Sequence, residues 1–272
     1  METKLTIIVD NIAADDIEGE WGLCMLALFR GRRILIDTGA SDLFARNLEK
    51  LGFDIEDIDY AVLSHAHYDH ANGMPLFFEK NSKAGFYVRD TTEPNCYHKN
   101  FLFRKYIGIP KRVLTDHPDR IEHVSGIYEL CEGAYLVPHS SPSLSAIGKR
   151  EMMYRRVGRK MVPDDFSHEQ SLVLDTDKGL VIISSCSHAG AVNIINEVKS
   201  AFEDRHIHAL VGGLHLHNKS EDEIRAVSRA ISETGIDLVY TGHCTKNRAF
   251  HIMKDELGDK VMQFRVGLEL VF

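Results

Sequence analysis

Apolar and polar positions along the chain follow two periods. Short apolar runs predict strands buried in a sheet, and apolar residues at every third or fourth position predict helices packed on it. In the second half the two kinds of segment alternate. The predicted strands cover residues 5–9, 23–29, 33–36, 60–63, 86–88, 127–130, 134–137, 171–174, 180–184, 207–211 and 236–240. This pattern predicts an α/β fold.

Polar residues mark the ends of the predicted helices. One helix is predicted between Ser41, which can cap its first turn, and Gly52, which can end it. A second covers about residues 192–202, where apolar residues keep helical spacing. Ser220 and Glu223 have the spacing of a capping box and predict the start of a third. Each helix connects two strands, as in a layered α/β domain.

The periodicity weakens in two stretches, near residues 89–112 and 139–166. Neither is a low-complexity linker, and the chain contains no internal repeat. We therefore expect irregular lid insertions in a single domain that spans residues 1–272. The first insertion interleaves aromatic and basic residues, and the second carries several arginines.

The composition, with 44% hydrophobic and 26% charged residues, is that of a globular protein. No apolar run approaches the roughly 20 residues of a membrane span. The chain opens without a secretory signal, and its five scattered cysteines give no disulfide framework. These features predict a cytoplasmic protein with no membrane partner, and they do not indicate an oligomeric state.

The charge is negative overall but unevenly distributed. A net charge of −8 argues against nucleic acid as a partner. Residues 83–160 contain fourteen Lys and Arg against eight Asp and Glu, so the rest of the chain carries −14. A basic insertion on an acidic body is expected where an anionic small molecule is held. A solvated basic face explains the same numbers equally well.

A dense cluster of metal-ligand side chains follows the fourth predicted strand. It is Ser64-His65-Ala66-His67-Tyr68-Asp69-His70. On extended backbone His65 and His67 point to the same side and can bind one ion. Asp69 and His70 follow after the chain turns, and face a neighbouring position where a second ion could sit. Imidazoles and a carboxylate suit a borderline cation such as Zn²⁺.

Three later strands also end in a histidine. They deliver His188, His215 and His243 immediately past their last residues. Sites in α/β sheets lie outside the strand ends. Three histidines in this position favour one shared site over three separate core histidines.

These motifs resemble those of the metallo-β-lactamase superfamily. The resemblance rests on His-x-His-x-Asp-His after an apolar strand and on Ile34-Leu35-Ile36-Asp37-Thr38-Gly39 before it. The segments 186–190, 212–216 and 241–244 resemble a branch of dihydropterin–ribofuranosyl-aminobenzene-phosphate synthases, also described as superfamily II metal-dependent hydrolases. The resemblance covers about residues 5–271. It implies an αβ/βα sandwich, in which two mixed β-sheets face each other with helices outside.

The resemblance also implies a ligand set. Two divalent ions are expected, with zinc as the first choice and manganese or iron as alternatives. Asp37 would support the ligands through hydrogen bonds. The implied metal ligands are His65, His67 and His188 for one ion, and Asp69, His70 and His243 for the other.

Three positions need separate treatment. The bridging aspartate of the superfamily aligns with Cys186, which is therefore a ligand, a bridging group or a small buried residue, and we favour a supporting role. His215 could bind metal or contact substrate; we favour contact, and assign it to catalysis together with Asp69. Trp21 stands where the branch more often has histidine, so it receives no metal role.

Three functions remain open. Two metals would clamp an oxyanion and lower the pKa of bound water towards ~7. This implies a dinuclear metal-dependent hydrolase that attacks an anionic, phosphate-containing small molecule through a metal-bound hydroxide. One alternative is a transferase that condenses a pterin diphosphate with an aminobenzene-ribofuranosyl phosphate. The other is a metal-binding sensor without turnover.

The insertions supply candidates for substrate contacts. Tyr97, Phe101, Phe103 and Tyr106 could stack on a flat ring, and Arg155 and Arg156 could hold a phosphate. The same residues could instead form the small core of the lid and its charged edges. We assign Tyr97, Phe103, Arg155 and Arg156 to substrate binding.

Overall fold

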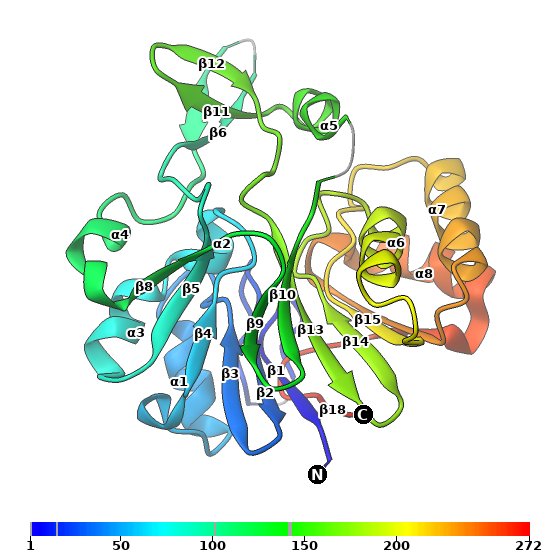
Figure 1. Ribbon diagram of the computed structural model, residues 1–272. Coiled ribbons are helices and arrows are strands. Elements are labelled where there is room, and N and C mark those ends of the chain that lie inside the picture. Colours follow the sequence, from blue (N-terminus) through cyan, green and yellow to red (C-terminus); the bar gives the residue numbers. More distant parts are fainter. Residues whose placement is uncertain (1, 15, 101, 141–142) are drawn as a thin grey trace.

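The computed structural model describes residues 2–14, 16–100, 102–140 and 143–272. Two seven-stranded sheets face each other, and helices cover the outer surface of each (Figure 1). Both sheets contain parallel and antiparallel neighbours. The αβ/βα sandwich predicted from the sequence is therefore confirmed.

The first sheet is built from the N-terminal part of the chain and closes with the last strand. In spatial order its strands are β18 (Glu269–Val271), β1 (Lys4–Val9), β2 (Cys24–Phe29), β3 (Arg32–Ile36), β4 (Tyr60–Val62), β5 (Gly85–Arg89) and β8 (Ile121–Val124). Helices α1 (Leu43–Lys50) and α3 (Met74–Lys80) cover its outer face, burying Phe44, Leu48 and Phe77. Between them lies the short helix α2 (Tyr68–Ala71).

The second sheet is built from the C-terminal half. In spatial order its strands are β17 (Val261–Gln263), β16 (Leu238–Thr241), β15 (Ile207–Val211), β14 (Gly179–Ile183), β13 (Gln170–Thr176), β10 (Ala134–Pro138) and β9 (Tyr128–Cys131). Helices α6 (Ala191–Ala201), α7 (Glu221–Glu233) and α8 (Lys246–Leu257) cover its outer face. The capping box expected at Ser220 and Glu223 starts α7.

The central strands are buried on both faces. In β14, Val181 and Ile183 face the core between the sheets, whereas Leu180 and Ile182 pack under the helices. Strands buried on both faces read as continuous apolar runs. This burial is why the sequence pattern identifies them so clearly.

The two insertions pair into a third sheet instead of remaining irregular. This lid sheet is antiparallel, in the order β12 (Lys160–Pro163), β11 (Met153–Val157), β6 (Cys96–Lys99) and β7 (Arg104–Tyr106). Its strands are short and largely half-exposed, so they lack an apolar period that the sequence could reveal. Helices α4 (Val113–Asp116) and α5 (Leu144–Arg150) lie beside its connections.

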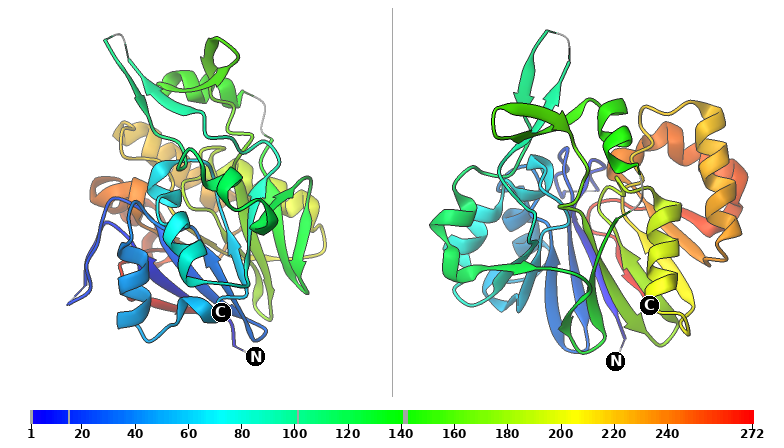
Figure 2. Two further views of the ribbon diagram at one scale, coloured as in Figure 1. Left: turned by 90° about the vertical axis from the view of Figure 1, so that its left-hand side faces the viewer. Right: turned by 45° about the horizontal axis from the view of Figure 1, so that its top comes forward.

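The lid sheet lies at one end of the sandwich and the two chain ends lie at the other (Figures 1 and 2). The strands β4, β14 and β15 end on the lid side (Figure 1), and so does β16, which pairs parallel with β15. Among the described residues, no helix is long and apolar enough to cross a membrane.

Candidate metal centre

The candidate ligands all follow strand ends beneath the lid sheet. His65 and His67 come after β4, in residues 64–70, called here the metal loop. His188, His215 and His243 come after β14, β15 and β16. Because these strands end at one rim of the sandwich, ligands far apart in sequence meet there.

His65, His67 and His188 form the first group of candidate ligands. Their possible ligand atoms lie within 4.8 Å of one another. Nε2 of His65, Nε2 of His67 and both ring nitrogens of His188 are buried without a hydrogen-bond partner. A buried polar atom left unpaired costs about 1–3 kcal/mol. Several such nitrogens in one place fit a bound cation.

Asp69, His70 and His243 form the second group. Oδ2 of Asp69 lies 3.7 Å from Nε2 of His243 and 4.0 Å from Nε2 of His70. Nδ1 of His70 is hydrogen-bonded to Asp37 at 2.7 Å, and Nδ1 of His243 to Oδ1 of Asn11 at 3.2 Å. These bonds turn both Nε2 atoms towards Asp69. Histidines that bind metal are commonly oriented in this way by a hydrogen bond to their other ring nitrogen.

Cys186 lies between the two groups. Its Sγ is 3.3 Å from Nε2 of His70, and it also lies within ligand distance of His65 on one side and of His188 on the other. Cys244 is 3.5 Å away as a second free thiol. Burial raises the pKa of the Cys186 thiol well above its ordinary value. The thiol thus lies within reach of both groups of candidate ligands.

The surroundings keep most of the histidines neutral, which is the form that binds metal. Burial lowers the pKa of His67 and of His243 to about 3, and lowers the pKa of His65 and His188 well below 6.5. His70 differs. Burial disfavours its charge, but the carboxylates of Asp37 and Asp69 outweigh burial and raise its pKa.

Asp37 joins the metal loop to the second sheet. Its carboxylate accepts hydrogen bonds from the backbone N–H and hydroxyl of Ser64, both at 2.7 Å, and from the hydroxyl of Ser185 at 2.6 Å. The hydroxyl of Ser64 also contacts Nδ1 of His65 at 2.9 Å. One buried carboxylate therefore orients His65 and His70 and fixes the end of β14.

Backbone strain concentrates at this rim. Asp37, Ser187, His215 and His243 all have positive φ, between 47° and 62°. Non-glycine residues in this region cost about 1–3 kcal/mol each and cluster at functional sites. The fold thus tolerates strain at four turns that deliver side chains to the candidate centre.

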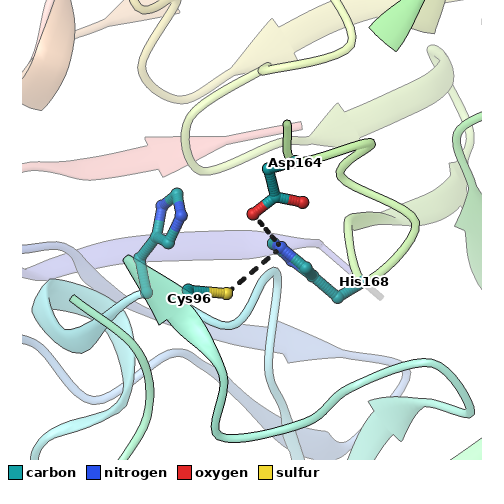
Figure 3. A group of neighbouring side chains, drawn as sticks. Cys96, Asp164 and His168 are labelled. Carbon is teal, nitrogen blue, oxygen red and sulfur yellow. Dashed lines mark hydrogen bonds and ion pairs between the residues drawn. The ribbon is translucent and has the colours of Figure 1, made fainter. Parts of the chain in front are cut away.

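A second cluster of ligand-type side chains consists of Cys96, Asp164 and His168, and both of the other side chains point towards His168 (Figure 3). Nε2 of His168 faces Oδ2 of Asp164 at 3.3 Å and Sγ of Cys96 at 3.6 Å. Its Nδ1 accepts a hydrogen bond from the N–H of Ala66 at 3.1 Å. Ala66 lies between His65 and His67, so this cluster connects the lid sheet to the first ligand group.

His188 and His215 line a cavity of about 240 Å³, called here the His215 cavity. Both ring nitrogens of His215 are buried without hydrogen-bond partners, and Glu151 lies 3.8 Å away. Burial opposes ionisation of Glu151, but hydrogen bonds from Lys219 and Asn218 outweigh it and lower the pKa to about 2. His215 therefore presents two unpartnered ring nitrogens at this cavity, beside a carboxylate that is ionised.

The predicted substrate-binding residues lie in the lid sheet. Tyr97 packs against Tyr106, with ring centroids 5.4 Å apart, and Phe103 is 61% exposed. Arg155 is bonded to Asp165 and Ser167, both at 2.8 Å, and Arg156 to the carbonyl of Gly158 at 3.0 Å. None of the four assigned residues lines the His215 cavity. Phe101 lies outside the described residues.

Several residues of the site are missed by sequence reasoning. Glu169 accepts hydrogen bonds from the N–H groups of His188 and Ala189. Glu169 and His168 directly follow the stretch 139–166, which the sequence presents as an irregular insertion and which contains Asp164. The spacing of Asp164, His168 and Glu169 is the signal that could have identified them. Glu151 carries no motif, and only the fold places it at the rim.

Comparisons with known proteins agree with this geometry. Residues 22–188 match the family model described as the metallo-β-lactamase superfamily. A Methanocaldococcus jannaschii protein named 7,8-dihydropterin-6-methyl-4-(β-D-ribofuranosyl)-aminobenzene-5′-phosphate synthase is 24% identical over 253 residues, which cover 89% of this chain and 85% of that relative.

Solved structures also match over almost the full length. Tm1679, described as a metal-dependent hydrolase of the β-lactamase superfamily, has a TM-score of 0.85 at 30% identity and covers 98% of both chains. A diphosphatase from the PhnP family has a TM-score of 0.57 at 14% identity, over 99% of this chain and 98% of that one. The second likeness shows a shared fold alone.

Proposed function

The chain belongs to the metallo-β-lactamase superfamily, and from this premise we propose that it is a metal-dependent hydrolase with two divalent ions, zinc first and manganese or iron as alternatives. The proposal depends on one observation above all, which is the set of buried ring nitrogens without partners at one rim. Native proteins pair nearly all buried polar atoms. These nitrogens fit bound cations.

The proposed ligands keep the two groups described above. His65, His67 and His188 would bind one ion, and Asp69, His70 and His243 the other, with Cys186 between them. Bound divalent ions would act as a Lewis acid and make water acidic enough to lose its proton near neutral pH. Asp37 holds His70 with its Nε2 towards the centre, so the protein supplies orientation as well as ligands.

Asp69 and His215 are the proposed catalytic side chains. Asp69 is buried between the two histidines of its group and can accept a proton from water or substrate held at the centre. His215 faces the His215 cavity with both nitrogens free and can deliver a proton to a leaving group there. Glu151 lies 3.8 Å from Nε2 of His215.

The proposed substrate is an anionic small molecule with a phosphate group, acted on in the cytoplasm without nucleic acid or membrane. Hydrolysis is preferred because Tm1679, at 30% identity, is described as a hydrolase. The relative at 24% identity is named a synthase, which supports transfer of a pterin group to an aryl acceptor as the second candidate. Tyr97, Phe103, Arg155 and Arg156 would then face the substrate when the lid sheet is closed over it.

Metal content tests the proposal without reference to turnover. Elemental analysis of the purified protein should give close to two metal equivalents per chain. The change His67→Ala should remove about one equivalent, because an ion that loses a ligand binds roughly 10- to 100-fold more weakly or worse. His251→Ala, on the exposed side of α8, should leave the content unchanged. Full occupancy in a protein that lacks both His65 and His67 would refute the assignment.

A further inference from the structure

A second cavity borders the candidate metal centre at His243. It has a volume of about 490 Å³ and is called here the Trp21 cavity. His243 and Gly242, which follow β16, form part of its wall. The remaining lining residues are Asn11, Ile12, Trp21, Lys246, Asn247, Arg248 and Gln263.

The Trp21 cavity contains cations that no carboxylate neutralises. Lys246 and Arg248 form no ion pair in the described parts of the chain; Arg248 only donates to the carbonyl of Lys219, at 2.9 Å. Both lie in the first turn of α8, which has no acidic residue. The N-terminus of a helix carries partial positive charge. Two basic side chains there are unfavourable unless an anion binds between them and the helix end.

In the His215 cavity the basic side chains are neutralised by a carboxylate. Its two basic residues, Arg150 and Lys219, both contact the carboxylate of Glu151. The rest of its lining is mostly apolar, with Ile147, Leu214 and Val227 among the contacts. Of the two cavities beside the centre, only the Trp21 cavity offers positive charge that is free for a ligand.

Trp21 gives the same cavity a flat apolar wall. Its ring is 37% exposed, although Trp side chains are usually well buried. The ring centroid lies 4.9 Å from that of His243, and the ammonium group of Lys246 lies 4.9 Å above it. If the ammonium group of Lys246 moved to bind an anion, the face of the Trp21 ring that it now covers would become accessible. Oδ1 of Asn247 accepts a hydrogen bond from Nε2 of Gln263 at 2.8 Å, and the Nδ2 group of the same amide can bind the edge of a ring.

We propose that the Trp21 cavity binds a phosphorylated planar ring compound, with its phosphate on Lys246 and Arg248 and its ring against Trp21. The inference builds on the proposed function, since it places the anionic part of the substrate next to His243. It also gives Trp21, to which the sequence assigns no metal role, a part in substrate recognition. An aromatic contact of this kind contributes about 1–3 kcal/mol, or roughly 5- to 150-fold in affinity.

Trp21 is the single tryptophan of the chain, so its fluorescence reports directly on the cavity. The zinc-loaded protein is titrated with guanosine 5′-monophosphate, guanosine and inorganic phosphate, by fluorescence and by calorimetry. We expect the nucleotide to quench Trp21 with saturation, and guanosine and phosphate to bind at least tenfold more weakly. Lys246→Ala and Arg248→Ala should each raise the Kd for the nucleotide about tenfold or more. In calorimetry Trp21→Phe should bind better than Trp21→Ala.

The matched control is Lys254→Ala, on the same helix, where the lysine already pairs with Asp259. This variant should bind the nucleotide like the unmodified protein. Equal affinity in the Lys246 and Lys254 variants, phosphate that binds as tightly as the nucleotide, or no nucleotide binding at millimolar concentration would overturn the inference. Metal analysis of the same samples separates the two proposals. Two bound equivalents without nucleotide binding would reject only the proposed ligand of the Trp21 cavity. Protein that binds no metal would reject the proposed metal-dependent hydrolase.

Discussion

At the residue scale, the hydrogen bond made by Nδ1 of a histidine ring fixes the direction in which Nε2 points. His70 donates from Nδ1 to Asp37, and His243 contacts Asn11 through the same atom. In both rings Nε2 is therefore left to face Asp69. The orientation of these ligands is set by residues that follow β1 and β3, so a change in the first sheet reaches the metal centre through hydrogen bonds.

The same contacts predict how many protons leave when metal binds. The pKa of His67 and His243 is about 3, and that of His65 and His188 is lowered, so these four are already neutral at pH 6. The pKa of His70 is raised, so it is protonated at pH 6 and must lose a proton to bind metal. We expect about one proton released per chain. Calorimetry at pH 6 in buffers of different ionisation enthalpy measures it, and metal binding without any proton release would contradict the raised pKa of His70.

The sequence indicates the ligands of the metal loop because they are adjacent in the chain. His65, His67, Asp69 and His70 share one strand end and one turn, so their spacing alone carries the information. The supporting residues cannot be found in this way. His168 contacts Ala66 from 102 positions away, and Glu151 meets His215 only because α5 and the turn after β15 lie against each other.

At the element scale, the turn after β15 shows how tightly the strand ends are packed. Gly212 has φ of +144°, and a Cβ there would lie 1.8 Å from the backbone oxygen of Ser184. Ser184 follows β14 and leads directly into Cys186. The close approach of these two strand ends is therefore part of the structure that holds the centre.

Replacing this glycine should disturb both stability and metal binding. We expect Gly212→Ala to lower the free energy of unfolding by more than about 3 kcal/mol and to reduce metal content, because the backbone of β14 must move. Gly158→Ala is the control, since Gly158 also has positive φ but no neighbour within 4 Å. It should cost about 1 kcal/mol and leave the metal in place. Equal losses in chemical denaturation would show that packing at Gly212 is unimportant.

The lid sheet is the element that sequence patterns describe least well. Its strands face solvent on much of both sides, and they pair residues more than 50 positions apart, such as Tyr97 and Tyr154. No local period encodes such a pairing. The charge of this region is nevertheless visible in the sequence, and it leads to a test of its function.

A substitution of Arg156 tests the charge of the lid sheet with little effect on its structure. The side chain of Arg156 is exposed and donates to the carbonyl of Gly158, whereas the side chain of Arg155 is bonded to Asp165 and Ser167. If the lid guides an anionic substrate, Arg156→Gln should raise KM about threefold, with kcat unchanged and a weaker dependence of KM on salt. Arg46→Gln, on the far side of α1, should change neither. Unchanged KM at low salt would mean that the basic face is only solvated.

At the scale of the whole molecule, the fold brings two halves of the chain to one rim. The first sheet supplies His65, His67, Asp69 and His70, and the second supplies His188, His215 and His243. Alternating strands and helices predict each half correctly, because both faces of each sheet are buried and the apolar pattern is strong. The way the two sheets face each other is not contained in that pattern. It follows from the resemblance to a known superfamily and is confirmed by the structure.

The central claim is that this rim holds two metal ions that support hydrolysis. The most direct measurement is a titration of metal-free protein with zinc, in which bound metal and hydrolysis of bis(p-nitrophenyl) phosphate are followed together. A pterin diphosphate with an aminobenzoyl acceptor is assayed in parallel. We expect hydrolysis to rise with bound zinc and to level off at two equivalents per chain. Coupled pterin product with an untouched phosphodiester, or activity that is complete with one equivalent, would contradict the claim.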